Sequence, residues 1–436
     1  MKLQKGKSNE GGVLVVTIVI CALVGLMLSA YLSMVSSQHS FTQRSQVWNN
    51  TIPMCEAGVE EAMAHINHIN TPSNNFAING WVRVSSTGHF IKERNINGGK
   101  CQMDIDNGYP PIITVRGSLK EPIGNGDVTR VVKVRTKMNQ RFPAAILAKG
   151  SITLSGSGLV DSFNSTNALE STGGLYDPAK ATDHALVATT LRTVNCLSVG
   201  NSTVFGSAAT GPGGTVRINP SGNVGDTPYC NNPIFNGTIQ PGHLFDDANY
   251  FIPSANLPSD FGSWNTVNPA IVPLIGGTNY KYAILSDGDY QMPSISVGIG
   301  ERMLVAAKAR LHVLGSTTVQ NSGYILLGPG ASIEWYARGP VSIGGGACIN
   351  VSGEAINFSI VALTSAPVNY GGNASLIGTI YAPLSSVSLN GTTDAYGAIT
   401  CNNFSLVGTM SIHFDEALKG NPKVRFLASS WQELKP

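Results

Sequence analysis

The chain has 436 residues, of which 12% are charged, and its formal net charge is only +2. Nucleic-acid binding requires a clustered basic surface, and no block of Lys or Arg follows the first few residues, so nucleic acid is excluded as a partner. Helix-rich soluble enzymes carry about a quarter charged residues, so this composition with 49 Gly indicates β-structure with many tight turns.

The N-terminal segment is predicted to span a membrane. No formally charged side chain occurs in residues 11–42, and residues 13–35 are almost all apolar. This run exceeds the roughly 20 residues that a helix needs to cross hydrocarbon about 30 Å thick. Lys2, Lys5 and Lys7 precede it, so the positive-inside rule predicts a cytoplasmic N-terminus. We expect an inner-membrane anchor at 13–36, with the bulk of the chain in the periplasm or at the cell surface.

The helix is expected to continue outside the membrane. Through residues 37–70, apolar residues recur at mixed three- and four-residue intervals, which is typical of an amphipathic helix. A cleaved secretory signal is the main alternative, but its apolar region is normally about 7–15 residues long. Pro53 would kink this helix or divide it in two.

Residues at both ends of this helix carry a resemblance to a known family. Gly11 and Gly12 precede the apolar run, and residues 55–62 read CEAGVEEA. This pattern resembles the N-terminal region of the PilX-type minor pilins, in which a Gly ends a short basic leader and an AEAGLEEA-like segment continues the helix. The resemblance implies a minor pilin or pseudopilin that a prepilin peptidase trims after a glycine. Such a subunit joins other pilin-like subunits in a type IV pilus or pseudopilus.

The resemblance also assigns roles to individual residues. Residues 1–12 become a leader that is cleaved after Gly11 or Gly12, with cleavage after Gly6 or no cleavage as alternatives. Cleavage after Gly12 would place a Thr at the fifth mature position, where major pilins carry a Glu that is costly in a bilayer unless it meets a partner charge. This departure indicates a minor, tip-located or priming subunit. The residues expected in the membrane and assembly helix are Val13, Thr17, Glu56, Gly58 and Glu60.

Residues 71–141 are predicted to form a small antiparallel meander. Residues 71–100 are rich in Asn, Ser and Gly and are expected to form a loop with one short strand at 81–84. Three stretches of alternating apolar and polar residues follow, separated by an Asn-Gly and a Gly-Asn-Gly turn. Alternation of this kind, interrupted by turn residues, is typical of hairpin-connected strands.

From residue 142 the chain is expected to fold as an all-β solenoid. Short strand-like runs recur about every 8–12 residues and end at Gly, Asn or Ser. Stacked coils fit better than a sandwich or barrel, because few runs are long enough for sandwich strands. Residues 219–280, which contain many Pro, are expected to form an excursion from the stack, and residues 419–436 a tail.

The two ends of this region carry a second resemblance. Residues 141–165 and 375–418 resemble an uncharacterised β-helical domain that is commonly fused behind PilX-type N-termini. The resemblance implies an exported right-handed β-helix over residues 142–418, without assigned chemistry. The expected fold class is therefore α+β, with a transmembrane and amphipathic helix, a small antiparallel meander and a right-handed β-helix.

The expected function is structural, as a membrane-anchored minor subunit with an adhesive or spacer module and without cofactor or metal. The alternative is a membrane-tethered β-helix enzyme or binding module that acts on a surface polysaccharide. Glycan-cleaving sites need paired carboxylates or a carboxylate beside a basic residue, and the candidates are His243, Asp246 and Asp247. A second polar group, His413 with Asp415 nearby, is expected to cap the last coil.

The seven cysteines leave two interpretations open. No two are spaced C-x-x-C, which excludes zinc-ribbon and thioredoxin-like sites. Cys21 lies in the apolar segment, so six cysteines remain that can pair in an oxidising compartment. Proximity favours Cys196–Cys230 and Cys348–Cys401. The alternative is that most are buried free thiols that act as small apolar residues.

Overall fold

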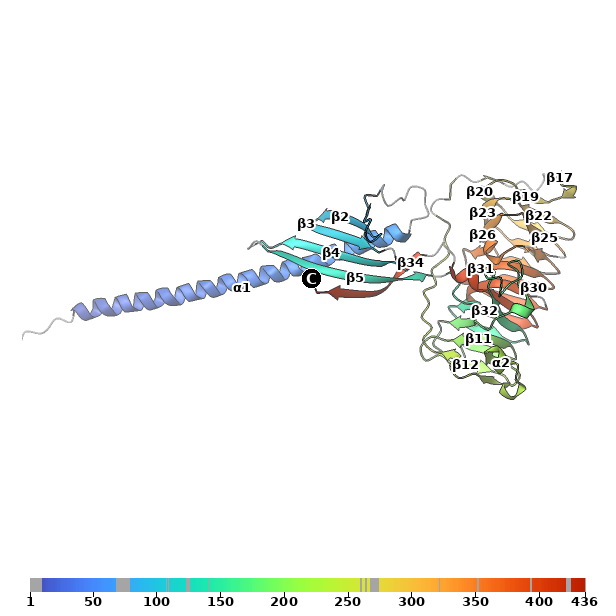
Figure 1. Cartoon of the computed structure of the whole chain (residues 1–436), viewed down its shortest axis with the longest axis horizontal. Helices are drawn as coiled ribbons and strands as arrows, with labels where there is room; N and C mark the ends of the chain where they lie inside the picture. Colours follow the sequence, from blue (N-terminus) through green and yellow to red (C-terminus); the bar gives the residue numbers. More distant parts are fainter. Residues whose placement is uncertain are drawn as a thin grey trace, which may run out of the picture. The chain divides into compact units, whose positions relative to one another are not determined.

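The chain divides into two compact units, which a computed structural model describes (Figure 1). The first unit comprises Met1–Asn139 and Arg425–Pro436, and the second comprises Gln140–Val424. One long helix is followed by mostly β-structure, so the α+β class is confirmed. The residues described are 10–67, 79–106, 108, 110–122, 126–139, 141–258, 261–262, 265–266, 274–320, 322–350, 353–392, 394–420 and 425–435.

The first unit is built on α1 (Glu10–Asn67), a single helix of 58 residues. It passes through Pro53 without interruption, so the alternative in which Pro53 divides the helix is wrong. Its C-terminal third packs on an antiparallel sheet through buried apolar residues that include Met54, Val59 and Ile66. The C-terminal third of α1 is therefore packed on the sheet, whereas its N-terminal part is exposed.

The sheet of the first unit has six strands in the order β1-β2-β3-β4-β5-β34, and every neighbouring pair is antiparallel. The expected meander strands are present, but two further strands belong to the same sheet. β2 and the start of β3 lie in the stretch expected to be loop, and β34 lies in the expected tail. The strands are β1 (Val82–Arg83), β2 (Phe90–Ile96), β3 (Gly99–Ile105), β4 (Ile112–Lys120), β5 (Asp127–Asn139) and β34 (Arg425–Leu434).

Close approach of α1 to this sheet depends on small residues. Gly58 is buried, and a Cβ at this position would lie 2.7 Å from both Cys101 Sγ and Val115 Cγ1. Gly117 meets the helix from the sheet side, beside Cys55 Sγ. Glycine is required here because it alone lets the helix backbone approach the strands.

The second unit contains a 26-stranded sheet whose strands pair in parallel. The strands before residue 250 are β6 (Ile146–Ala148), β7 (Ile152–Leu154), β8 (Leu159–Phe163), β9 (Ala185–Thr189), β10 (Leu197–Gly200), β11 (Thr203–Ala209), β12 (Val216–Ile218), β13 (Asn223–Gly225), β14 (Thr238–Ile239) and β15 (Leu244–Phe245), with a short helix α2 (Thr227–Cys230).

The later strands are β16 (Asn265–Thr266), β19 (Tyr282–Ile284), β20 (Gly288–Met292), β21 (Ile295–Val297), β22 (Arg302–Val305), β23 (Lys308–Val313), β24 (Thr317–Val319), β25 (Tyr324–Leu327), β26 (Ser332–Ala337), β27 (Val341–Ile343), β28 (Cys348–Ile349), β29 (Phe358–Ala362), β30 (Val368–Gly372), β31 (Ser375–Gly391), β32 (Ala395–Gly408) and β33 (Ile412–Asp415). A separate hairpin joins β17 (Leu274–Ile275) to β18 (Thr278–Asn279).

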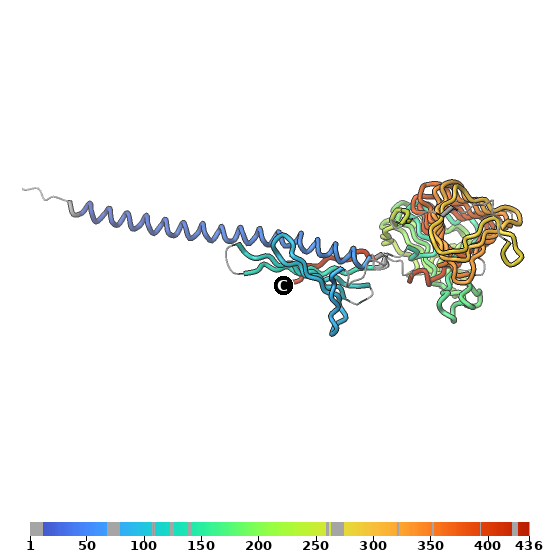
Figure 2. The backbone as a smooth tube through the Cα atoms, turned by 90° about the horizontal axis from the view of Figure 1, so that it is seen from above, coloured from blue at the N-terminus to red at the C-terminus, as the bar shows by residue number. Residues whose placement is uncertain are grey.

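From β19 to β27, each strand pairs with the third strand further along the chain. Figure 2 shows the resulting turns of backbone lying over one another. Six of the parallel strands also close a ring, in the order β6, β9, β11, β8, β33 and β32. The more specific class, a right-handed β-helix, stays a prediction.

The interior of the second unit is filled by rows of apolar residues, each row taking one residue from every strand of a face. Tyr290, Leu311, Trp335 and Ile360 occupy paired positions on β20, β23, β26 and β29 and are all buried. Burial of each such side chain stabilises the fold by about 1.5–3 kcal/mol. Trp335 and Tyr370 are among the largest fully buried side chains of this core.

The strands do not stack in chain order. The last strands, β32 and β33, pair with β6, β7 and β8 near the start of the unit. The two ends that carry the second resemblance are therefore hydrogen-bonded neighbours. The expectation that His413 and Asp415 cap the last coil is wrong, because β33 lies between β32 and β8 inside the sheet.

The expected excursion at 219–280 is also shorter than predicted. β13, β14 and β15 lie within it and pair in parallel with neighbours in the sheet. The segment after β15 contains the connection to the next part of the sheet, and Pro253, Phe261 and Gly262 in it make contacts along the outside of the strands. The many prolines in residues 219–280 indicated a connection, but they did not indicate where it begins.

All seven cysteines are free. The disulfides Cys196–Cys230 and Cys348–Cys401 predicted by proximity are therefore absent, and that prediction is wrong. Five of the seven are buried, and burial raises the pKa of Cys230 to about 12. A buried thiol of this kind acts as a small apolar side chain.

Candidate functional site

Two features of the molecule can serve a function outside the core: an exposed apolar helix and a polar groove. Residues 12–39 of α1 are exposed without exception, although most of them are apolar. Val13 is 67% exposed and Met27 71% exposed. Single exposed apolar side chains are ordinary, but a continuous apolar surface of this length marks contact with lipid or with another protein. By length and composition this helix can cross a membrane.

The predicted assembly residues fall into different environments on α1. Val13 and Thr17 lie in the exposed apolar part, where the Thr17 hydroxyl donates to Val13 O at 2.7 Å. Glu56 and Glu60 lie on the exposed face of the sheet-packed part. Gly58 also lies in α1 and is buried against the unit's own sheet. Gly11 and Gly12 lie in the first turn of α1.

The sequence pattern did not identify Glu61 as the acidic residue of α1 that forms ion pairs with the sheet. Glu61 pairs with Lys92 Nζ at 2.7 Å and with Arg94 Nη1 at 2.6 Å, and both cations come from β2. Burial would raise the pKa of Glu61, but the hydrogen bonds from Lys92 and Arg94 outweigh it and hold the pKa below its usual range. The prediction of a loop at 71–100 hid these partners, because its one short strand at 81–84 does not include Lys92 or Arg94.

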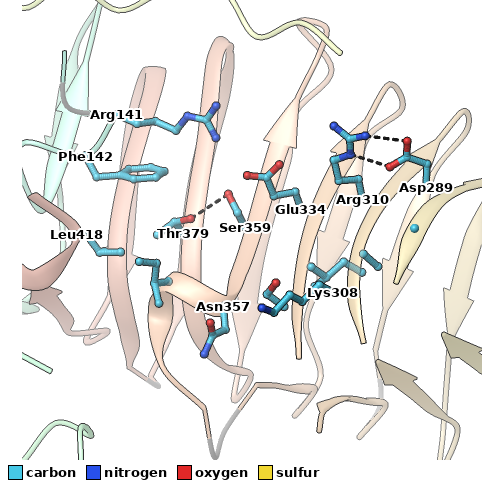
Figure 3. Close-up of a pocket in the computed structure, with 15 residues that line it drawn as sticks. Arg141, Phe142, Asp289, Lys308, Arg310, Glu334, Asn357, Ser359, Thr379 and Leu418 are labelled. Carbon is cyan, nitrogen blue, oxygen red and sulfur yellow. Dashed lines mark hydrogen bonds and ion pairs between the residues drawn. The ribbon is translucent and has the colours of Figure 1, made fainter. Parts of the chain in front are cut away.

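The groove lies on the outer surface of the second unit and encloses about 650 Å³ (Figure 3). Its floor is a row of side chains in register on five neighbouring strands, which are β20, β23, β26, β29 and β31. We call this row the polar ladder: Asp289, Arg310, Glu334, Ser359 and Thr379. Because successive side chains of a strand point to opposite faces, the ladder faces away from the buried row that contains Trp335.

Contacts within the polar ladder hold its side chains in place. Arg310 donates to both oxygens of Asp289, at 2.6 and 2.8 Å (Figure 3). Burial would raise the pKa of Asp289, but Arg310 and the backbone N–H of Gly262 lower it below its usual range. The Thr379 hydroxyl donates to Ser359 Oγ at 3.0 Å. These contacts fix the direction of donors and acceptors before any ligand arrives.

A second outward row lies beside the ladder and is covered. Tyr336 and Tyr381 occupy this row, yet each is only 3% exposed. The connecting segment covers them, since Tyr381 donates to Pro253 O at 2.6 Å and the Phe261 ring lies 5.9 Å from the Tyr336 ring. Tyr336 also donates to Glu334 Oε2 at 2.8 Å. The connecting segment therefore covers this row, whereas three side chains of the adjacent ladder, Asp289, Arg310 and Glu334, are partly exposed and Ser359 and Thr379 are buried.

The catalytic candidates predicted from the sequence do not form a catalytic group. His243 Nδ1 donates to the backbone oxygen of Gly206 at 2.7 Å rather than pairing with an aspartate. His243 and Asp247 line one hollow of about 660 Å³ together with Asp183 and His184, whereas Asp246 is not among the lining residues. His243 and Asp247 therefore line the same hollow, but no hydrogen bond joins them in the described part of the chain.

A buried polar cluster surrounds His413. Its Nδ1 bonds to Asp161 Oδ1 at 2.6 Å, and its Nε2 lies 3.9 Å from Asp394 Oδ2. The rings of Tyr176 and Tyr396 lie 3.8 and 4.9 Å from the His413 ring. Tyr176 comes from the loop between β8 and β9 and donates to Asp161 Oδ2 at 2.7 Å. This cluster joins that loop to three neighbouring strands.

Comparison with known proteins adds little to this description. A family model described as "Domain of unknown function (DUF7305)" matches residues 300–421. A search of curated proteins finds no match. Among solved structures, the competence-associated pilin ComZ from Thermus thermophilus is similar with a TM-score of 0.25 and 10% sequence identity, over 89% of this chain and 97% of that chain. A TM-score this low carries no argument.

Proposed function

We propose that the chain is a membrane-anchored minor subunit of the pilin or pseudopilin type. In this proposal, the apolar part of α1 lies in the inner membrane and packs against other pilin-like subunits, and the N-terminus faces the cytoplasm. Both β-rich units then lie in the periplasm or at the cell surface. The second unit is a right-handed β-helix that acts as an adhesive or spacer module, and the role is structural rather than catalytic.

The observation that carries the proposal is the division of one continuous helix into two environments. The C-terminal part buries Val59, Ala62 and Ile66 on the antiparallel sheet, while residues 12–39 have no partner within the described chain. Each large apolar side chain gains about 1.5–3 kcal/mol when it leaves water. A bilayer or a bundle of similar helices supplies that environment for the whole apolar stretch.

The resemblance to PilX-type N-termini supports the finer part of the proposal. Leader removal after Gly11 or Gly12 by a prepilin peptidase would leave the apolar part of α1 at the start of the mature chain. Thr17 then carries no charge at the position where major pilins carry Glu, which suits a subunit present in few copies. The parallel pairing of each strand with the third one onward supports the β-helix, since that is the pairing expected of coils of three strands.

Charge substitution in the apolar stretch tests the anchor. In full-length protein, Leu23→Arg with Met27→Arg should release the chain from membranes under alkaline carbonate, because each Arg costs about 2.5–3.5 kcal/mol at the centre of a spanning helix. Glu60→Arg, on the exposed face of the same helix outside this stretch, should stay in the membrane pellet. Pilin-like subunits should co-purify with the wild type.

Two outcomes would contradict the proposal. One is recovery of the wild-type chain in the soluble fraction. The other is a double arginine variant that remains in the pellet as fully as the wild type. A wild type that is held in the membrane but co-purifies with no pilin-like subunit would support an anchored envelope protein and exclude assembly.

A further inference from the structure

We propose that the groove over the polar ladder binds a linear glycan chain that lies across successive strands of the second unit. The inference concerns residues Asp289, Arg310, Glu334, Ser359 and Thr379, with Lys308 and Asn357 at the side of the groove (Figure 3). It goes beyond the anchoring role and does not depend on it, because every residue used belongs to the second unit.

The shape of the groove suits an extended polymer. Neighbouring strands of a sheet lie about 4.8 Å apart, so the five rungs of the ladder extend over about 19 Å. The hollow of about 650 Å³ falls within the range of about 300–1,000 Å³ that is usual for ligand sites. A chain with a regular repeat would meet a new rung at regular intervals along the groove.

The chemistry of the groove suits hydroxyl groups. The three partly exposed rungs are charged, and their sign alternates from Asp289 to Arg310 to Glu334. The exposed Lys308 and the partly exposed Asn357 add donors at the side. Sugar hydroxyls both donate and accept, so they match a row of mixed polarity. Ile356, which is 42% exposed, adds apolar surface for the carbon faces of sugar rings.

Two other linear polymers fit the groove less well. An extended peptide that adds to a sheet needs unpaired backbone groups at a strand edge, whereas the ladder strands β23, β26 and β29 are paired with a neighbouring strand on both sides. A nucleic acid needs a predominantly basic path for its phosphates. The carboxylates of Asp289, at one end of this row, and of Glu334, in its middle, would repel them.

Binding of defined oligosaccharides to the full chain tests the proposal. The probes are linear hexasaccharides of β-1,4-glucose, β-1,4-N-acetylglucosamine and α-1,4-galacturonate with their disaccharides, measured by titration calorimetry in a zwitterionic detergent without a sugar headgroup. We expect at least one hexasaccharide to bind with a sub-millimolar Kd and its disaccharide at least about tenfold more weakly, because a short chain meets fewer rungs.

Matched variants locate the site. Lys308→Ala with Asn357→Ala should weaken hexasaccharide binding about tenfold, and Glu334→Gln should weaken it while preserving side-chain shape. The control is Arg217→Ala with Asn236→Ala, which removes one exposed cation and one exposed amide elsewhere in the second unit. The control should bind within about twofold of wild type. Thermal unfolding midpoints confirm that all variants are folded.

Several results would overturn the inference. They are the absence of binding by every hexasaccharide up to about 10 mM, equal affinity for hexasaccharide and disaccharide, and equal losses in groove and control variants. A fourth is binding of a mixed-sequence decapeptide or an oligodeoxynucleotide, in place of the sugars, that the groove variants abolish.

Discussion

His413 joins parts of the second unit that are far apart in the sequence. It is 4% exposed, bonds to Asp161 on β8 and lies under the Tyr176 ring. Burial would lower the pKa of His413, but hydrogen bonds to Asp161 and Asp394 outweigh it and raise that pKa above its usual value. The imidazolium is therefore favoured in the folded chain and stabilises it through charge-assisted hydrogen bonds.

Stability of the second unit should therefore fall at alkaline pH. A folded-state pKa raised above the unfolded value of about 6.5 contributes stability that is fully present below about pH 6.5 and is lost as pH rises through the folded value. Denaturant unfolding followed by Trp335 fluorescence at several pH values between about 6 and 9 measures this loss. His413→Gln should remove most of it.

Two variants make this measurement specific. Asp161→Asn should lower the free energy of unfolding by about 3–5 kcal/mol, since it leaves a buried charge without its closest partner. His184→Gln, at an exposed histidine of the same unit, should keep the pH dependence of the wild type. An unchanged pH profile in His413→Gln would show that another group is responsible.

At the scale of single elements, β11 and β32 each turn a corner at a glycine. Gly206 divides the part of β11 that pairs with β8 from the part that pairs with β9, and Gly397 divides β32 in the same way between β33 and β6. Both have a positive φ, +145° and +141°, which L side chains rarely adopt. These two corners allow the ring of six parallel strands to close.

Substitution at one corner should destabilise the second unit strongly. In Gly397→Ala the new Cβ would collide with Gly378 O, and backbone strain alone costs about 1–3 kcal/mol. Gly328→Ala is the control, because a Cβ there makes only ordinary contacts and φ is not positive. The control should change the free energy of unfolding by less than about 0.5 kcal/mol. Equal, small effects in equilibrium unfolding would contradict the role of the corner.

Local sequence pattern predicted the elements whose signal is local. The apolar run of α1 and the alternation in β3, β4 and β5 were sufficient, because period and turn residues are visible in one short window. β34 was missed because its partner β5 precedes it by the whole second unit. The polar ladder was missed for the same reason, since its register aligns residues from Asp289 to Thr379 that no local pattern relates.

At the scale of the whole molecule, the second unit is an insertion in the first. The chain leaves the first sheet after β5 and returns as β34, which pairs with β5 along most of its length. Arg130 on β5 also donates hydrogen bonds to both carboxylate oxygens of Glu433 on β34, at 2.6 and 2.7 Å. Both connections to the second unit therefore start from adjacent strands of one sheet.

Protease accessibility in intact spheroplasts is the most direct test of the anchored arrangement. With the membrane-bound peptides identified by mass spectrometry, external protease should degrade both β-rich units and leave a short, membrane-bound fragment that contains the apolar part of α1. A chain that is fully protected until the membrane is lysed, or that is recovered whole in the cytosol, would contradict the account.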